Sequence, residues 1–548
     1  MLPEGDPKTP EAHATAGAAT GTFTSSAGLP ILAVARAADY AVGANRKGSP
    51  AGATWSFLLP KLPVGRVAIL GTPDHATRER LTDLADEVVD GLPDGGTLDL
   101  IWVASSGGPS APDRAALRAR LAHGGLIVDE RPGAEADPGQ DAARYRVLRR
   151  GGDTIVAVPR GHTASEAWLG RRGLYGTFKR GPRDRLRRQA SRLRGRTPPI
   201  APAWGSLDLV GVAGLDRPAL YLRVLAAAEG IDIDAHAMVV SATGPYRTQK
   251  VLLPLFAPGA SAPDLIVKAT RHPSVNPRLQ VELDGLRWLA TVDSAIAERV
   301  PAVRFAGMHA GMLVVGETVL DGEPFRAPSA HEHALAADAV DWLTRLGICT
   351  AERVDAGAVA AALSELVDAY VAADGPGRTM AGALREQVKR IGSSQASFPV
   401  VAQHGDPGTW NLVALPGDRT GFLDWENLER RGMPLWDLFY LLRSLGVGSR
   451  PRRPLERRLG HVQRTFLDDS ELTPFILEAV RRYCAQVGIA DDLVEPLYHL
   501  GWMYQALKEV TRLQPGHLGE GHFYALLRRG LERRDRGTLQ PLFRGTLT

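Results

Sequence analysis

Cysteine is scarce in this sequence. Only Cys349 and Cys484 occur among 548 residues, and they show neither a disulfide framework nor a metal-ligand spacing. No run approaches the ~18 consecutive apolar residues of a membrane-spanning helix, and the first residues lack a basic segment followed by an apolar core. We therefore expect a protein of a reducing compartment, the cytoplasm, without a signal peptide or a transmembrane helix.

An excess of charge of one sign is also missing. Lys and Arg number 65 against 61 Asp and Glu, a net charge of +4 at pH 7, which is too small to indicate a specific nucleic-acid partner. Residues 171–196 depart from this balance with eleven Lys or Arg and one acidic residue, Asp184. Such a segment is typical of a solvated linker or of a peripheral contact with an anionic surface, and both interpretations stay open.

Residues 51–170 lack a glycine-rich cofactor loop. Strands predicted at 67–70, 98–103 and 124–129 alternate with helical patterns at 76–89 and 112–121, which indicates a Rossmann-like parallel sheet. The segment resembles a degenerate class I methyltransferase domain, but only Gly71 stands in the loop after the first strand. A scaffold domain without a cofactor site and an active methyltransferase that binds S-adenosylmethionine are the two hypotheses for it.

A compact motif does appear between residues 403 and 442. His404, Asp406 and Asn411 follow the pattern H-G-D-x-x-x-x-N, and Asp424 ends a short apolar run. A carboxylate such as Asp406 can orient an acceptor hydroxyl and take its proton. Asn411 and Asp424 offer the oxygen ligands that Mg²⁺ prefers when it also binds phosphates. The layout predicts phosphoryl transfer, with His404 holding the loop beside the catalytic Asp406.

These residues resemble the aminoglycoside phosphotransferase and choline-kinase-like family, relatives of the protein kinases. The resemblance rests on HGDPGTWN, on Asp424 followed by Trp and Glu, and on the later Gly-x-Pro and Asp-Leu pair at Gly432 and Asp437. It covers residues 205 to 548. It implies a bilobal fold, ATP and Mg²⁺ as cofactors, and a small-molecule hydroxyl as the phosphate acceptor.

The resemblance also implies a nucleotide site in residues 205–325. Lys268 ends an apolar strand, where an unpaired ammonium would be costly, and the family places such a lysine on the ATP phosphates with a helix glutamate. Glu282 is the candidate, and Asp284 competes with it. The backbone near Glu317 and Val319 is expected to read the adenine edge. The predicted phosphate loop, residues 243–250, contains one glycine.

The predicted fold class is therefore α/β plus α+β, a Rossmann-like parallel sheet followed by a bilobal kinase-like domain. The predicted parts are a disordered tail at 1–50, the Rossmann-like domain at 51–170, a basic linker at 171–204, the N-lobe at 205–325 and a mostly helical C-lobe at 326–548. The predicted activity is ATP-dependent phosphorylation of a sugar, an aminoglycoside-like compound or an amino alcohol. A catalytically degenerate scaffold, or a bifunctional kinase with an active methyltransferase, are the alternatives, and the oligomeric state stays open.

Overall fold

The computed structural model describes most of the chain in segments. They are residues 54–60, 62, 64–105, 114–131, 142–150, 153–171, 203–211, 217–242, 249–325, 330–373, 379–394, 396–447, 466–468, 470–510 and 521–535. The predictions for the tail (1–50), for nearly all of the basic segment (171–196) and for most of the phosphate loop (243–250) therefore lie outside the described residues.

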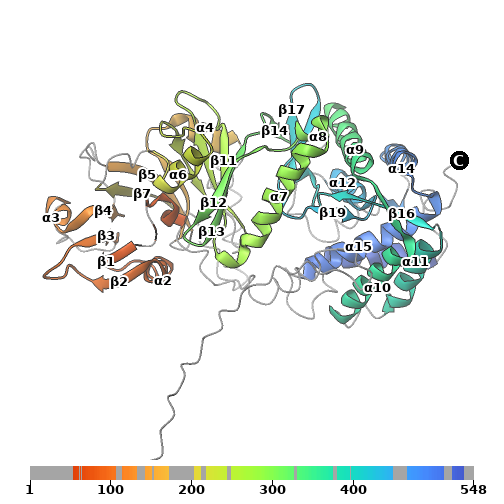
Figure 1. The fold of residues 1–548 in the computed structure, drawn as a ribbon, viewed down its shortest axis with the longest axis horizontal. Helices are drawn as coiled ribbons and strands as arrows, with labels where there is room; N and C mark the ends of the chain where they lie inside the picture. The colour runs from red at the N-terminus through yellow and green to blue at the C-terminus, as the bar shows by residue number, and fades with distance from the viewer. Residues whose placement is uncertain are drawn as a thin grey trace, which may run out of the picture.

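The N-terminal part begins as a parallel sheet with helical connections (Figure 1). Its strands are β1 (Val64–Leu70), β2 (Ala85–Asp90), β3 (Leu98–Val103), β4 (Leu121–Asp129), β5 (Ala142–Arg150), β6 (Asp153–Pro159) and β7 (Ala203–Val210). Its helices are η1 (Thr54–Leu58), α2 (His75–Leu84), α3 (Arg114–Arg118) and α4 (Thr163–Arg171). Strands β2, β1, β3 and β4 pair in parallel in that order. The predicted Rossmann-like winding is present in these four strands.

Two boundaries in this part differ from the sequence prediction. The helix expected over 76–89 ends at Leu84, because the valine-bearing stretch that follows pairs with β1 as strand β2. The expected start of the N-lobe at residue 205 falls inside β7. That strand lies between β4 and β5 and runs antiparallel to both, so the N-terminal unit extends to Val210.

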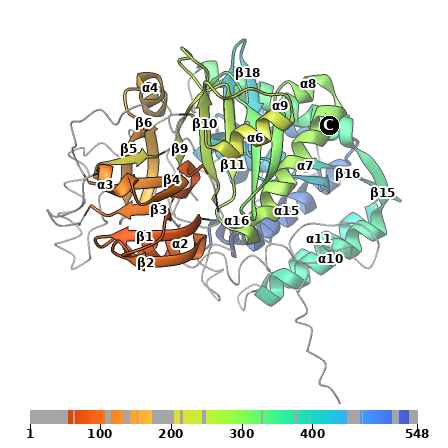
Figure 2. The same cartoon turned by 60° about the vertical axis from the view of Figure 1, so that its left-hand side comes forward.

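The N-lobe of the kinase-like region continues the same sheet. Its elements are α6 (Leu220–Ala228), β8 (Ala237–Met238), β9 (Val240–Ser241), β10 (Val251–Phe256), β11 (Leu265–Ala269), η2 (Pro273–Val275), α7 (Asn276–Val292), α8 (Ser294–Ala297), β12 (Val303–His309) and β13 (Met312–Thr318). Strand β6 pairs with β9, which joins the two parts into one 13-stranded sheet. Figure 2 shows β5, β6, β9, β10 and β11 in succession across this joint.

One apolar core serves both halves of the large sheet. It contains Trp55 and Trp102 of the N-terminal part together with Tyr221, Leu253 and Val314 of the N-lobe, all almost fully buried. Apolar surface removed from water in this way stabilises the parts jointly. The two parts therefore share one core, although the sequence predicts two domains with a linker.

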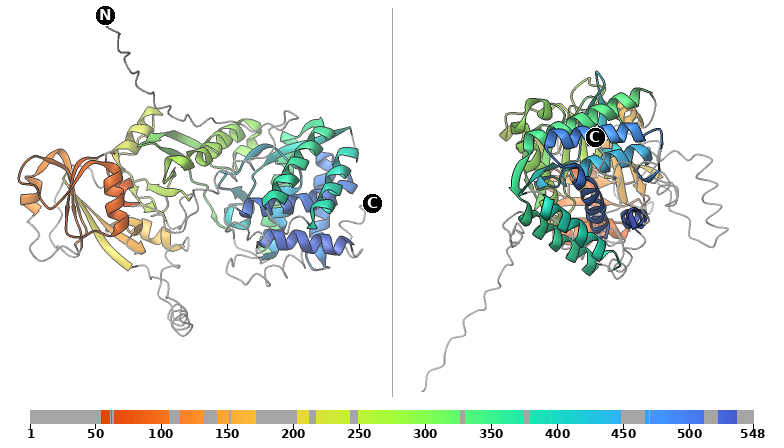
Figure 3. Two further views of the ribbon diagram at one scale, coloured as in Figure 1. Left: turned by 90° about the horizontal axis from the view of Figure 1, so that it is seen from below. Right: turned by 90° about the vertical axis from the view of Figure 1, so that its right-hand side faces the viewer.

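The C-lobe is mostly helical and lies at the other end of the molecule (Figure 3). Its helices are α9 (Ala330–Thr350), α10 (Ala356–Ala373), α11 (Ala381–Ser394), η4 (Thr409–Asn411), α12 (Trp436–Val447), α14 (Thr473–Val487), η6 (Asp491–Leu493), α15 (Val494–Val510) and α16 (His522–Asp535). Its strands are β14 (Glu323–Pro324), β15 (Glu352–Asp355), β16 (Ser397–Gln403), β17 (Leu412–Leu415), β18 (Arg419–Phe422) and β19 (Glu429–Gly432). The predicted bilobal, kinase-like fold is confirmed.

Helix α10 is long and apolar enough, by length and composition alone, to cross a membrane. One face of it, including Val359, Leu363 and Tyr370, is buried in the C-lobe core, where α10 packs against α11 and α15. A buried core helix passes the same test, so its composition agrees with the packing that the structure gives it.

Candidate functional site

The catalytic loop leaves β16 through a tight glycine turn. Gly405 has a φ of 79°, and a Cβ there would lie 2.6 Å from the backbone oxygen of Asn427. Only glycine combines a positive φ with so close an approach. Beyond the turn, the Asn411 side-chain Nδ2 donates to the backbone oxygen of Asp406 at 2.9 Å. The loop therefore fixes these two predicted site residues against each other.

His404 ties this loop to the chain that carries Asp424. Its Nε2 lies 2.8 Å from the carbonyl oxygen of Leu423, and its Nδ1 accepts from the backbone N–H of Asp406 at 3.3 Å. Because a carbonyl can only accept, Nε2 carries the proton and the imidazole is neutral. The backbone N–H of His404 donates in turn to the carboxylate of Asp437 at 2.5 Å. These are the contacts of a positioning residue.

Asp406 presents an oxygen without a partner. Its Oδ2 accepts from the indole Nε1 of Trp410 at 3.4 Å, and Trp410 is 55% exposed beside it. Its Oδ1 is buried and has no hydrogen-bond partner among the described residues. A buried acceptor left unpaired costs about 1–3 kcal/mol, so such atoms call for an explanation. A hydroxyl donor from a substrate would satisfy this one.

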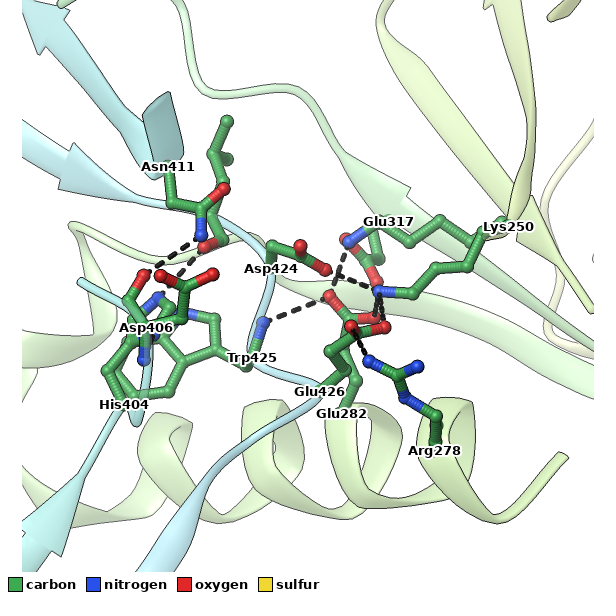
Figure 4. Close-up of polar contacts among 12 residues, drawn as sticks. Lys250, Arg278, Glu282, Glu317, His404, Asp406, Asn411, Asp424, Trp425 and Glu426 are labelled. Carbon is green, nitrogen blue, oxygen red and sulfur yellow. Dashed lines mark hydrogen bonds and ion pairs between the residues drawn. The ribbon is translucent and has the colours of Figure 1, made fainter. Parts of the chain in front are cut away.

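Asn411 ends η4 directly before β17, and Asp424 lies just beyond β18, the strand that pairs with β17. The backbone N–H of Leu423 donates to the carbonyl of Asn411 at 2.9 Å, which places the two predicted metal ligands next to each other (Figure 4). Asp424 has a φ of 69°, a strained conformation for a non-glycine residue that recurs at functional sites. Among the described residues, no three His, Cys, Asp or Glu side chains are grouped to hold a metal. An amide and a carboxylate oxygen nevertheless fit Mg²⁺ that takes its other ligands from phosphates and water.

Lys268 and Glu282 meet as predicted. Lys268 Nζ on β11 lies 2.5 Å from Glu282 Oε1 on α7, and Glu282 Oε1 also accepts from the backbone N–H of Trp425 at 3.2 Å. Both side chains are almost fully buried. Asp284, the predicted competitor, is exposed and accepts from Gln280. The pairing therefore selects Glu282, because its carboxylate faces the sheet.

Glu317 belongs to the site through its side chain. The sequence predicts a backbone role for it, but its backbone pairs with the neighbouring strands at Ile266 and Val303. Its carboxylate lies 2.8 Å from Lys268 Nζ and is buried. An acidic residue within the apolar strand Met312–Thr318 is the signal that could have revealed this, because a buried carboxylate needs a cation.

Val319 follows β13, where the sequence predicts contact with the adenine edge. Its N–H donates to the carbonyl of Asp264 at 3.3 Å, so this donor is already used within the protein. The predicted role of Val319 in nucleotide binding stays a prediction.

Lys250 is a site residue that the sequence reasoning missed. Its Nζ lies 2.5 Å from Asp424 Oδ1, 2.6 Å from Glu282 Oε2 and 3.1 Å from Glu426 Oε2. Arg278 also pairs with Glu426. Figure 4 shows Lys250 reaching into this group from the N-lobe. The sequence signal that could have revealed it is a lysine at the last position of the predicted phosphate loop, residues 243–250.

The charges of the group act on one another. Burial raises the pKa of Glu282, but the ammonium groups of Lys250 and Lys268 outweigh it and hold that pKa below its usual range. The same two lysines lower the pKa of Asp424 against the effect of burial. Burial raises the pKa of Glu317 to about 7, although Lys268 opposes the rise. At neutral pH, Glu282 and Asp424 are therefore ionised and ready to hold cations.

The geometry agrees with the comparison with known families. Residues 257–472 match the model of a phosphotransferase enzyme family, which confirms the predicted resemblance over the part of the chain that carries Lys268, Asp406, Asn411 and Asp424. The match and the bilobal fold together define a phosphotransferase-type region. The match does not extend to residues 51–170, whose resemblance to a methyltransferase stays a prediction.

Several solved structures are similar to this chain at low sequence identity. Aminoglycoside phosphotransferase APH(3'')-Id from Streptomyces rimosus, in complex with ADP and streptomycin, is 17% identical, with 48% of this chain and 91% of that chain covered and a TM-score of 0.30. Choline kinase LicA from Streptococcus pneumoniae is 17% identical, with 52% and 89% covered and a TM-score of 0.31. A choline/ethanolamine kinase family protein from Mesorhizobium loti is 14% identical, with 54% and 86% covered and a TM-score of 0.28. No curated protein matches the chain. Values this low do not identify an acceptor.

Proposed function

We propose that the protein is an ATP- and Mg²⁺-dependent phosphotransferase that moves the γ-phosphoryl group to a hydroxyl of a small molecule. The observation that carries the proposal is the buried Oδ1 of Asp406, which has no hydrogen-bond partner within the described part of the chain, in the loop that also fixes Asn411. An acceptor hydroxyl would donate to that oxygen, which orients the hydroxyl and receives its proton. A sugar, an aminoglycoside-like compound or an amino alcohol each carries such a hydroxyl.

The roles of the other residues follow from charge. Lys268, held by Glu282 and Glu317, would bind the ATP phosphates. Asn411 and Asp424 would hold Mg²⁺, which supplies neutralisation of the phosphate charge when bound. A new bond forms between the acceptor oxygen and the γ-phosphorus as the bond from that phosphorus to ADP breaks. Positioning and charge account for most of the catalysis in such a transfer.

The test separates binding from chemistry. We expect calorimetry to show that the wild type binds ATP with Mg²⁺ and that Asp424→Ala weakens this binding at least tenfold, because Asp424 carries the charged metal ligand. Asp406→Asn should bind Mg·ATP like the wild type, because Asp406 faces the acceptor. A wild type that binds no nucleotide would overturn the proposal and leave the scaffold hypothesis.

The acceptor is then found by ADP release in a screen of sugars, aminoglycosides and amino alcohols. Asp406→Asn is the control that lacks the general base, and we expect its rate to fall about 10²–10⁴-fold, the usual contribution of such a base. An acceptor-dependent rate that Asp406→Asn leaves unchanged would remove Asp406 from the mechanism.

A further inference from the structure

Lys250 occupies an unusual position for a second lysine of this site. It is the residue before β10 and the last residue of the predicted phosphate loop. Its side chain is only 11% exposed, and its ammonium contacts carboxylates from both lobes, Glu282 on α7 and Asp424 with Glu426 beyond β18. Lys250 therefore links the predicted metal ligand Asp424 to the N-lobe.

The charge of the group explains why Lys250 would not stay there in a loaded site. The carboxylates of Glu282, Glu317, Asp424 and Glu426 face the cations of Lys250, Lys268 and Arg278. Once Asp424 serves a metal ion, the Lys250 ammonium loses one of its three partners, and a buried ammonium needs replacement acceptors. Phosphate oxygens next to Lys268 would supply them.

The two lysines already share one carboxylate, since Glu282 offers Oε1 to Lys268 and Oε2 to Lys250. A phosphate bound by Lys268 would thus lie within reach of a Lys250 side chain that turns away from Asp424.

We propose that Lys250 is a second phosphate-binding lysine of the nucleotide site. This inference rests on the proposed function. Lys250 contacts Asp424 in the structure; with Mg·ATP bound, its ammonium would turn to the phosphates and Asp424 would be free to hold the metal. A side-chain cation there would add to the phosphate contacts of the predicted phosphate loop, whose sequence contains one glycine.

If Lys250 only holds Asp424 in place and binds no phosphate, its loss should have the opposite effect on Mg·ATP affinity. If its ammonium only occupied the metal position, it would compete with Mg²⁺ for Asp424, and removing it would tighten nucleotide binding. If it binds phosphate, removing it weakens binding. The direction of the change in Mg·ATP affinity therefore distinguishes the two roles.

The experiment is calorimetry on the full chain with Mg·ATP and with AMP. We expect Lys250→Met to weaken Mg·ATP binding about tenfold or more, a loss typical of a charge-assisted hydrogen bond, and to change AMP binding much less. Lys250→Arg should recover most of the affinity. The control Lys389→Met removes an exposed lysine of α11 and should bind like the wild type. Unchanged or tighter Mg·ATP binding by Lys250→Met overturns the inference.

A second comparison covers the case in which Lys250→Met does not fold. Asp424→Asn releases Lys250 from the carboxylate, so it should bind metal-free ATP more tightly than the wild type does. The double variant Asp424→Asn with Lys250→Met removes one charge of each sign and should lose that gain. Equal affinity of the two variants refutes the role of Lys250. If the wild type binds no nucleotide, the proposed function itself fails, and this inference fails with it.

Discussion

Glu282 connects more of the candidate site than any motif residue does. Its carboxylate accepts hydrogen bonds from the ammonium groups of Lys268 and Lys250 and from the backbone N–H of Trp425. The side chain is fully buried. Such a carboxylate is held by cations on both of its oxygens. Losing it leaves two buried ammonium groups short of a partner, which costs more than the original pairs contribute.

We therefore expect Glu282→Ala to lower the free energy of unfolding by about 3–5 kcal/mol, the range for breaking a buried pair on one side. Asp284→Ala is the matched control, because Asp284 lies on the same helix and is exposed. Its effect should stay within about 0.5 kcal/mol, as for ordinary surface substitutions. Urea unfolding at pH 7 measures both. If Glu282→Ala and Asp284→Ala lowered the free energy of unfolding equally, Glu282 would not be the residue that holds the two lysines.

At the residue scale, the sequence predicts the side chains whose chemistry needs close spacing. His404, Asp406 and Asn411 lie within one loop, and their contacts follow from that loop. Glu317 was assigned by its backbone instead, and Lys250 was not assigned at all. Both enter the site through carboxylates and ammonium groups that are distant in sequence, so a local pattern could not reveal them.

At the element scale, helices α15 and α16 bury a histidine between them. His499 is fully buried, and burial, together with Arg534 and Arg390, lowers its pKa to about 3. Glu495, one turn earlier, faces it at 3.9 Å. The unfolded chain has the ordinary histidine pKa near 6.5 and so binds the proton more readily than the folded protein does.

The contribution of neutral His499 to the free energy of unfolding should therefore be fully present above about pH 6.5. It should be lost progressively as the pH drops from about 6.5 toward 3. At pH 5 the loss is roughly 2 kcal/mol, at about 1.4 kcal/mol per pH unit. Urea unfolding at pH 5 and pH 7.5 measures it, and His499→Gln should show a smaller difference between the two. The control His123→Gln, at an exposed position of β4, should keep the wild-type difference. If His499→Gln showed the same difference in unfolding free energy between pH 5 and pH 7.5 as the wild type, His499 would not be the group responsible for the loss.

Helices and strands were predicted well from the sequence where apolar residues recur at a strong period. They were predicted poorly where pairing between strands decides the secondary structure. The helical patterns of the C-lobe became α9, α10, α14, α15 and α16. The stretch at 85–90 has a helix-like pattern, but it became β2 because β1 offers it a parallel partner. Pairing with a strand from elsewhere in the chain outweighs local propensity.

At the scale of the whole molecule, the joint between the N-terminal part and the N-lobe decides how the chain folds. Strands β6 and β9 pair at Val156 and Ser241, and the apolar core runs through both parts. Without the N-terminal part, β9 would be a bare edge and half of that core would be exposed. Exposed strand edges and apolar patches favour aggregation.

We therefore expect a chain that starts at residue 217 to be insoluble or unfolded, although it retains every residue of the candidate site. Soluble yield and far-UV circular dichroism measure folding, and calorimetry with Mg·ATP measures the site. The full chain is the control. A truncated chain that folds and binds Mg·ATP like the full chain would show that the shared sheet is dispensable.

The sequence by itself predicted phosphoryl transfer and the residues Asp406, Asn411 and Asp424, which lie in one loop and just beyond the strand pair that follows it, because their short spacing along the chain brings them together. It also predicted that Lys268, a lysine ending a buried strand, needs an acidic partner, but it left Glu282 and Asp284 in competition until the structure selected Glu282. Only the tertiary structure decided the place of Lys250 and the single sheet that joins the two parts. Those contacts link residues far apart along the chain, and burial and charge pairing settle them only when the whole chain has folded.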